Sequence, residues 1–235
     1  MYPEPYFDKE VLDKEHEEIR KNGFEPDTIL ITQTDLTVYG LNIAIGWPFP
    51  APLKEPYEKF FHELSILGPD TYLYPYANTH ITVMTLVNFK EHQYPGEEVK
   101  EIKELVPEIF KLVSRELHEF KPFKIDMGPP VILKRAAIIP ILNPTGEVLR
   151  FREKIRPLLE NTLSLKVESP KGVHSTILRF LKCPPDVNGF IAKFESIAAN
   201  TRMGEVAINE LLLTSETKPY MRDGEILHHF RLGDL

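Results

Sequence analysis

Two short stretches of the sequence, NTHITVMTL around His80 and GVHSTILRF around His174, carry the same arrangement of polar side chains. Each stretch has a histidine, a threonine two positions later, and apolar residues on both sides. Residues i and i+2 of a β-strand point to the same face, so His80 would share a face with Thr82, and His174 with Thr176. If both strands line one cleft, two imidazoles and two hydroxyls meet there.

These side-chain types are suited to proton transfer at a phosphodiester. An imidazole has an ordinary pKa of about 6.5, so one copy can act as a base while another acts as an acid near neutral pH. Threonine hydroxyls can donate hydrogen bonds to phosphate oxygens without adding charge. No Asp or Glu lies within three residues of His80 or His174, so the motifs lack the carboxylate ligands of two-metal phosphodiesterases. We therefore predict chemistry without a metal or another cofactor.

This interpretation rests on the presence of two H-x-T motifs. A single H-x-T pattern is common by chance, and a lone histidine on a strand is more often structural. The elements around the motifs repeat as well. An apolar strand ending in proline (LNIAIGWP, then AIIPILNP) and a helix precede each histidine, and a helix and a strand follow it. The order predicts an α/β (α+β) fold of two similar lobes, related by a pseudo-twofold axis that would bring the two histidine strands face to face.

Apolar periodicity gives the expected elements. Helices are predicted at 8–22, 55–67, 97–120, 146–163 and 186–200, and strands at 36–46, at both histidine motifs and in PFKIDMG, VILKRAAIIPIL, EVAINELLLTSE and EILHHFRLG. Pro107 lies inside the third helical stretch, where it should kink the helix or start a second one. Pro157 lies inside the fourth stretch.

Composition limits the classes of function. The 235 residues carry a formal net charge of −7, which favours a small or short substrate over coating of a long nucleic acid. The only cysteine, Cys183, cannot form an internal disulfide, which fits a reducing compartment. The sequence has no apolar run of the ~20 residues that a membrane helix needs and shows no secretory signal. We expect a cytoplasmic monomer that does not associate with membranes.

Paired H-x-T motifs in a duplicated α/β chain resemble the 2H phosphoesterase superfamily, also called LigT-like. This superfamily includes RNA 2′,3′-cyclic phosphodiesterases, the so-called 2′-5′ RNA ligases and 2′-5′ oligoadenylate phosphodiesterases. The resemblance covers residues 36–235, which we expect to form one two-lobed catalytic domain after an N-terminal extension with a short helix at 1–35. It implies a duplicated two-lobe fold with antiparallel sheets lining a central cleft. It also implies hydrolysis of a 2′,3′-cyclic phosphate or a 2′-5′ phosphodiester in a nucleotide or short RNA.

The resemblance also implies roles for the motif residues. His80 and His174 would be the acid/base pair, and Thr82 and Thr176 would hold phosphate oxygens; which histidine is the base stays open. Two other classes remain: a catalytically inactive RNA- or nucleotide-binding module, and a scaffold protein on the same fold.

Three further residues are candidates for substrate binding. Tyr76 would stack on a nucleobase if the strand of His80 began early enough, and would otherwise pack on the lobe surface. Asn42 lies on the small-residue face of the first strand, where it either reaches the cleft or is a buried amide bonded to backbone. The superfamily's second motif often carries an arginine at the place of Arg179, although simple alternation points this side chain away from the cleft.

Overall fold

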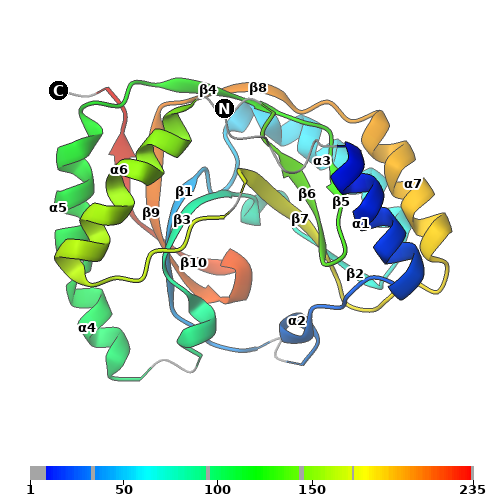
Figure 1. Ribbon diagram of the computed structural model, residues 1–235, viewed down its shortest axis with the longest axis horizontal. Coiled ribbons are helices and arrows are strands. Elements are labelled where there is room, and N and C mark those ends of the chain that lie inside the picture. Colours follow the sequence, from blue (N-terminus) through cyan, green and yellow to red (C-terminus); the bar gives the residue numbers. More distant parts are fainter. Residues whose placement is uncertain (1–8, 33–34, 94–95, 143–145, 171, 234–235) are drawn as a thin grey trace.

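Two four-stranded antiparallel sheets face each other in the computed structural model, which describes residues 9–32, 35–93, 96–142, 146–170 and 172–233 (Figure 1). The elements in chain order are α1 (Lys9–Asn22), α2 (Thr28–Thr32), β1 (Gly40–Ile45), α3 (Lys54–Leu64), β2 (Thr71–Leu73), β3 (Ile81–Val87), α4 (Glu98–Glu104), α5 (Val106–Leu117), β4 (Phe123–Met127), β5 (Val131–Ile132), β6 (Ala136–Pro140), α6 (Gly146–Leu163), β7 (His174–Phe180), α7 (Val187–Ala199), β8 (Gly204–Ile208), β9 (Glu210–Lys218) and β10 (Asp223–Arg231).

The strand order is β10-β9-β1-β3 in the first sheet and β2-β7-β6-β5 in the second. Helices α4, α5 and α6 lie outside the first sheet, and α1, α3 and α7 lie outside the second (Figure 1). A two-stranded ribbon of β4 and β8 runs across the top of both. This mixed architecture with antiparallel sheets confirms the predicted fold class.

The two halves exchange short segments with each other. Strand β2, which leads toward the first histidine motif, pairs with β7 of the second lobe. In return, Glu168, which precedes the second motif, forms a two-way backbone bridge with Thr85 of β3, with both N–H···O distances at 2.8 Å. Each half of the chain therefore supplies backbone partners to the histidine strand of the other half. This pairing also joins the lobes through backbone hydrogen bonds rather than side chains alone.

The prolines act in two different ways. Pro107 lies in the first turn of α5, so the predicted helix at 97–120 is two helices, α4 and α5. The first turn tolerates proline because its N–H groups lack helical partners anyway. Pro157 lies within α6, which continues through it. The buried Ile155 and Leu159 on either side anchor α6 in the core, which is how tertiary packing retains a helix against an interior proline.

The N-terminal helix packs on the second lobe. Ile19 of α1 is fully buried, and α1 is followed directly by Gly23, whose φ of 76° suits glycine. The ring of Phe24 then stacks on Phe180 of β7 with 4.0 Å between centroids. The division of the chain at residue 35 stays a prediction. Among the described residues, the helices are too short or too polar to cross a membrane.

Candidate active site

The two histidine strands carry a β-bulge at the same place. In each motif the residue directly after the threonine, Val83 in β3 and Ile177 in β7, is skipped in the pairing with the neighbouring strand. A bulge adds one residue and so shifts the alternation of side chains between the two faces. The residue five positions after each histidine therefore faces the same side as the histidine. These residues are Thr85 in β3 and Arg179 in β7.

The side chains on this face enclose a cleft of about 230 Å³ between the sheets. It is lined by Asn42, Tyr74, His80, Thr82, Thr85, Asn88, Phe89, Lys90, Thr176, Arg179, Glu216, Tyr220 and Met221. His80 directly precedes β3 and His174 is the first residue of β7, so both imidazoles lie at strand beginnings rather than at mid-strand as the sequence predicts. His174 is not among the residues that line this cleft, although Thr176 and Arg179 of the same strand are, and the charge of His80 contributes to lowering the pKa of His174.

The tautomer of His80 follows from its hydrogen bond. Its Nδ1 lies 2.9 Å from the carbonyl oxygen of Asn78, which can only accept, so Nδ1 carries the proton and Nε2 has the free lone pair. Burial lowers the pKa of His80 to about 4; the Asn78 carbonyl opposes this shift, and the charge of Arg179 adds to it. The imidazole is therefore neutral at pH 7 in the unliganded cleft.

His174 is held neutral for related reasons. Burial is the main cause that lowers its pKa to about 4, and the positive charges of Arg152 and Arg179 and the neighbouring His80 contribute further. The positive charges of Arg152 and Arg179 near neutral imidazoles make this region suited to an anion. An anion bound there would offset the arginine charges and raise the pKa of both histidines.

Arg179 crosses the cleft and is held on three sides. Its Nε donates to the hydroxyl of Tyr74 at 3.0 Å, and one terminal nitrogen donates to Asp27 at 3.1 Å. The guanidinium lies over the ring of Tyr220, 3.8 Å from its centroid. The structure thus places Arg179 in the cleft, and the bulge at Ile177 is the reason that simple alternation gives the opposite direction.

Arg152 of α6 is a functional candidate that the sequence analysis missed. It is buried behind the two histidine strands, where Nε donates to the carbonyl of the bulge residue Val83 at 2.8 Å. Its terminal nitrogens reach the carbonyls of Pro170 (3.2 Å) and Gly172 (3.4 Å), just before His174. One side chain therefore fixes both motifs relative to each other. A charged residue on the otherwise apolar face of the predicted helix at 146–163 is the signal in the sequence that could have identified it.

Asn42 lies in the cleft floor as part of a buried network. Its Nδ2 donates to Glu216 at 3.1 Å, and its Oδ1 accepts from the hydroxyl of Thr85 at 2.9 Å. Glu216 also accepts from the backbone N–H of Met221 at 2.8 Å, and burial raises the pKa of its carboxyl to about 7. The side chain of Asn42 thus has side-chain partners within the floor rather than the backbone partners expected for a buried amide.

Tyr76 is not among the side chains that line the cleft. Residues Tyr76–Asn78 form a single 3₁₀ turn rather than an early part of β3, so alternation does not apply there. The hydroxyl of Tyr76 donates to the carbonyl of Phe49 at 2.5 Å, and its ring lies near Tyr57 and the ammonium of Lys54. Its proposed stacking on a nucleobase therefore needs a substrate that reaches beyond the cleft.

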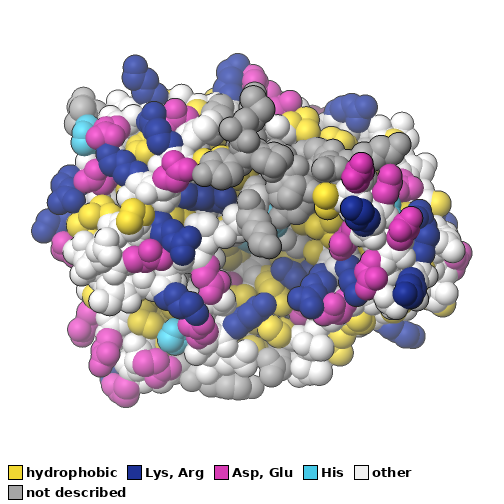
Figure 2. All heavy atoms as spheres, viewed as in Figure 1, with side chains coloured by type: hydrophobic (Ala, Val, Ile, Leu, Met, Phe, Trp, Pro, Cys, Tyr) yellow, Lys and Arg dark blue, Asp and Glu magenta, His cyan; other side chains and the backbone are white. Residues whose placement is uncertain are grey.

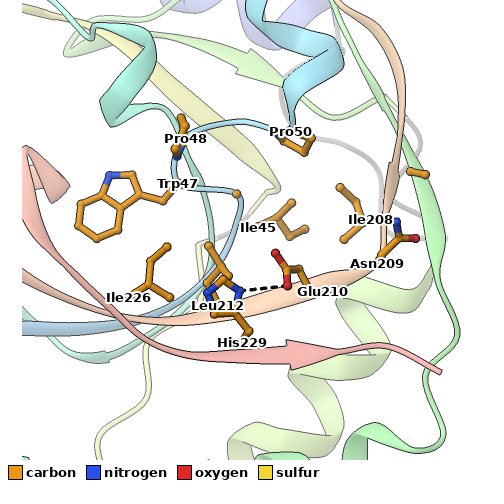
Figure 3. A pocket seen from close by; sticks show the side chains of 12 residues that line it. Ile45, Trp47, Pro48, Pro50, Ile208, Asn209, Glu210, Leu212, Ile226 and His229 are labelled. Carbon is orange, nitrogen blue, oxygen red and sulfur yellow. Dashed lines mark hydrogen bonds and ion pairs between the residues drawn. The ribbon is translucent and has the colours of Figure 1, made fainter. Parts of the chain in front are cut away.

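A second cavity, of about 450 Å³, lies on the same face of the first sheet (Figure 3). Leu212, which lines it, pairs with Ala44, and Glu216 of the histidine cleft pairs with Gly40 in the same two strands. Its walls are mainly apolar, with Trp47 at one side and Glu210 hydrogen-bonded to His229 along the bottom, Oε2 to Nδ1 3.0 Å (Figure 3). It offers apolar binding surface next to the polar cleft.

Two further observations concern the ligands that the protein can bind. Lys and Arg side chains gather below a hollow in the middle of one face of the molecule (Figure 2). Within the described residues, there is no group of three or more His, Cys, Asp or Glu side chains that could hold a metal ion.

Comparison with known proteins identifies the fold. The sequence matches no protein-family model and no curated protein. TT0787 of Thermus thermophilus is 18% identical with a TM-score of 0.56, over 83% of this chain and 98% of that one. Escherichia coli LigT complexed with 3′-AMP is 15% identical with a TM-score of 0.54, over 85% and 100%. A conserved protein of unknown function from Agrobacterium tumefaciens, ATU0111, is 10% identical with a TM-score of 0.63, over 94% and 99%. The chain has a LigT-like fold.

Proposed function

We propose that this protein is a metal-independent phosphodiesterase that uses His80 and His174 as an acid/base pair. The observation that supports this most directly is the pair of H-x-T motifs, each at the start of a strand bulged at the same position and each contributing its threonine to one cleft. A scaffold has no reason to keep two histidine–threonine pairs at matching positions of two strands whose threonines line one cavity. The LigT-like fold supports the same chemistry.

The substrate is a 2′,3′-cyclic phosphate or a 2′-5′ phosphodiester of a nucleotide or short RNA. One imidazole removes a proton from the attacking water, and the other donates a proton to the leaving ribose oxygen, so one P–O bond forms as another breaks. Thr82, Thr176 and Arg179 donate hydrogen bonds to the non-bridging oxygens as charge develops there. One imidazole must be protonated in this step, and the bound phosphate supplies the charge that raises its pKa.

A product-resolved substrate panel tests the activity. It contains 2′,3′-cyclic nucleotides, 2′-5′ and 3′-5′ dinucleotides, cyclic oligonucleotides and ADP-ribose cyclic phosphate, each with and without EDTA. We expect turnover of a cyclic phosphate or 2′-5′ bond that survives EDTA and is nearly lost in both His80→Ala and His174→Ala. Activity that disappears with EDTA and returns with added metal would refute the mechanism. Binding without turnover across the panel would favour the alternative, an inactive nucleotide-binding module.

The second cavity supports a nucleotide rather than a smaller phosphodiester, because its apolar walls suit a nucleobase. Trp47 is the only tryptophan in the chain, so intrinsic fluorescence reports on this cavity. We expect 3′-AMP to change the emission and inorganic phosphate to leave it unchanged. Ile226→Arg at the cavity should weaken the 3′-AMP response, whereas Ile66→Arg at another exposed site should not. Equal responses to both ligands would argue against a base site here.

A further inference from the structure

The segment between α1 and α2 reaches the cleft through a single carboxylate. Asp27 is buried, with 7% of its side chain exposed, and its Oδ2 lies 3.1 Å from a terminal nitrogen of Arg179. Its backbone N–H donates to the carbonyl of Phe180 at 2.7 Å, which fixes the segment to the end of β7. Its Oδ1 accepts from the N–H of Leu30 at 3.0 Å at the start of α2. Asp27 thus joins the N-terminal segment to the cleft arginine.

The same segment bounds a cavity that continues from the cleft. This cavity of about 160 Å³ is lined by Glu25, Pro26, Asp27, Thr28, Ile29, Lys90, Arg135, Arg179 and Tyr220, and it shares Lys90, Arg179 and Tyr220 with the histidine cleft. The other carboxylate in its wall, Glu25, pairs with the exposed Arg135 at 2.7 Å. The two acidic residues therefore have different partners, and Asp27 is the one that pairs with the cleft arginine.

We propose that Asp27 is a positioning residue for the phosphate site: it orients the guanidinium of Arg179 so that its remaining donors face a bound phosphate. An arginine has five N–H donors, and the bonds to Tyr74 and Asp27 use two of them. With the guanidinium over the ring of Tyr220, its remaining N–H groups can donate to two oxygens of one phosphate, as planar guanidinium groups do. This inference rests on the proposed function for the identity of the ligand. It makes the N-terminal segment part of the substrate site.

The carboxylate also has an electrostatic role. Arg179 disfavours protonation of both histidines, and a carboxylate beside it reduces the net charge that the imidazoles experience. Without Asp27 the guanidinium would lose one of its three contacts and could turn out of the plane that Tyr74 and Tyr220 define. The expected consequence is weaker phosphate binding, with the fold retained.

The substitution Asp27→Asn tests this with little disturbance of the fold. Asparagine caps a helix about as well as aspartate, so the bond to Leu30 can persist while the ion pair with Arg179 is lost. The control Glu25→Gln removes the neighbouring ion pair with the exposed Arg135. Inorganic phosphate is titrated against each protein by NMR of the histidine ring protons, which needs no turnover, and thermal unfolding is measured in parallel.

We expect Asp27→Asn to raise the Kd for phosphate about tenfold, which is the effect of losing one charge-assisted hydrogen bond. Glu25→Gln should leave this Kd unchanged. With a substrate from the panel, KM should rise more than kcat falls, and Asp27→Glu should recover part of the loss. In an Arg179→Lys background, Asp27→Asn should have little further effect, because both changes act through the same guanidinium.

Two results would overturn the proposal. One is unchanged phosphate affinity in Asp27→Asn, whatever happens to its melting temperature. The other is full additivity of Asp27→Asn with Arg179→Lys, which would mean that Asp27 acts elsewhere. If the panel shows no turnover, the phosphate titration still decides whether Asp27 positions Arg179, so failure of the proposed function can be told apart from failure of this inference.

Discussion

The two motif threonines are the residues whose role is most directly testable. Thr82 and Thr176 line the cleft, and each can lose its hydroxyl without a change of shape in the substitution to valine. We expect Thr82→Val and Thr176→Val each to reduce kcat about 10²–10³-fold, because each removes one donor to the developing charge on phosphate. The control is Thr71→Val, a strand threonine outside the cleft. Full activity in both cleft variants, measured on the best panel substrate, would make these threonines structural.

The lowered pKa values of the histidines predict an acidic optimum. With a pKa of about 4 for each, both His80 and His174 are neutral at pH 7. The catalytic form, in which one histidine is protonated and the other is neutral, is therefore scarce at this pH. We expect kcat/KM to rise as the pH falls from 7 to 5, because this form becomes about tenfold more abundant per pH unit. The maximum of kcat should lie at higher pH, since the bound phosphate raises both values. A kcat/KM that declines over this range contradicts the assignment.

The same shift has a consequence for stability, which the pH experiment must control for. A pKa that is lower in the folded chain than the ordinary value of about 6.5 means that the unfolded chain takes up protons first. Stability from this source is therefore complete above the ordinary pKa and is lost as the pH falls toward the folded value of about 4. Circular dichroism at each pH separates loss of structure from change of activity.

At the scale of elements, β-strand alternation predicted part of the site and then failed at one identifiable point. It placed Thr82 beside His80 and Thr176 beside His174, because these pairs precede the bulges. It pointed Arg179 the wrong way, since Ile177 adds an extra residue and the motif sequence carries no signal for a bulge. It was also not applicable to Tyr76, which lies in a 3₁₀ turn.

Contacts between side chains of distant elements could not be predicted from the sequence. The ion pair of Asp27 with Arg179 and the bonds from Arg152 to both motifs join segments far apart in the chain. Local periodicity reports which face of an element is buried, and it does not report which partner lies against that face. The longer helices and strands were predictable because each has its own periodicity. The short α2 and β2 were not predicted, and the single strands expected in VILKRAAIIPIL and EVAINELLLTSE are each two strands, β5 and β6, and β8 and β9.

The small-residue face of β1 gives a prediction at this scale. A Cβ added at Gly40 would lie 2.6 Å from Oε1 of Glu216, whose side chain is buried and hydrogen-bonded to Asn42. We expect Gly40→Ala to lower the free energy of unfolding by about 1–3 kcal/mol, as overpacking does, and to disturb the cleft floor. The control is Gly146→Ala at the start of α6, where an added Cβ meets no atom of the described residues within 4 Å, and it should be neutral or slightly stabilising. Denaturant unfolding of both variants measures this, and equal stabilities would mean that Glu216 moves aside freely.

At the scale of the molecule, the site depends on pieces that cross between the two halves of the chain. The first sheet takes β9 and β10 from the C-terminal end, and the second sheet takes β2 from the first half. The hydrophobic core is continuous across both lobes, and it includes Phe24 as well as Phe230. Each lobe is therefore incomplete without the other half of the sequence, and the pseudo-twofold axis between the lobes stays a prediction.

This arrangement predicts that the lobes do not fold separately. A fragment of residues 1–128 contains β1 and β3 but lacks the strands that pair with the other edge of β1, and residues 129–235 contain β7 but lack β2. An unpaired buried strand edge leaves backbone groups without partners, which a small core cannot offset. We expect each fragment to lack a cooperative thermal transition by circular dichroism, and the full chain to lose hydrogen-exchange protection of β1 and β6 together in denaturant. A fragment that unfolds cooperatively alone, or β1 and β6 opening at different denaturant concentrations, would show that the lobes are independent units and that the cleft forms by docking of two prefolded parts.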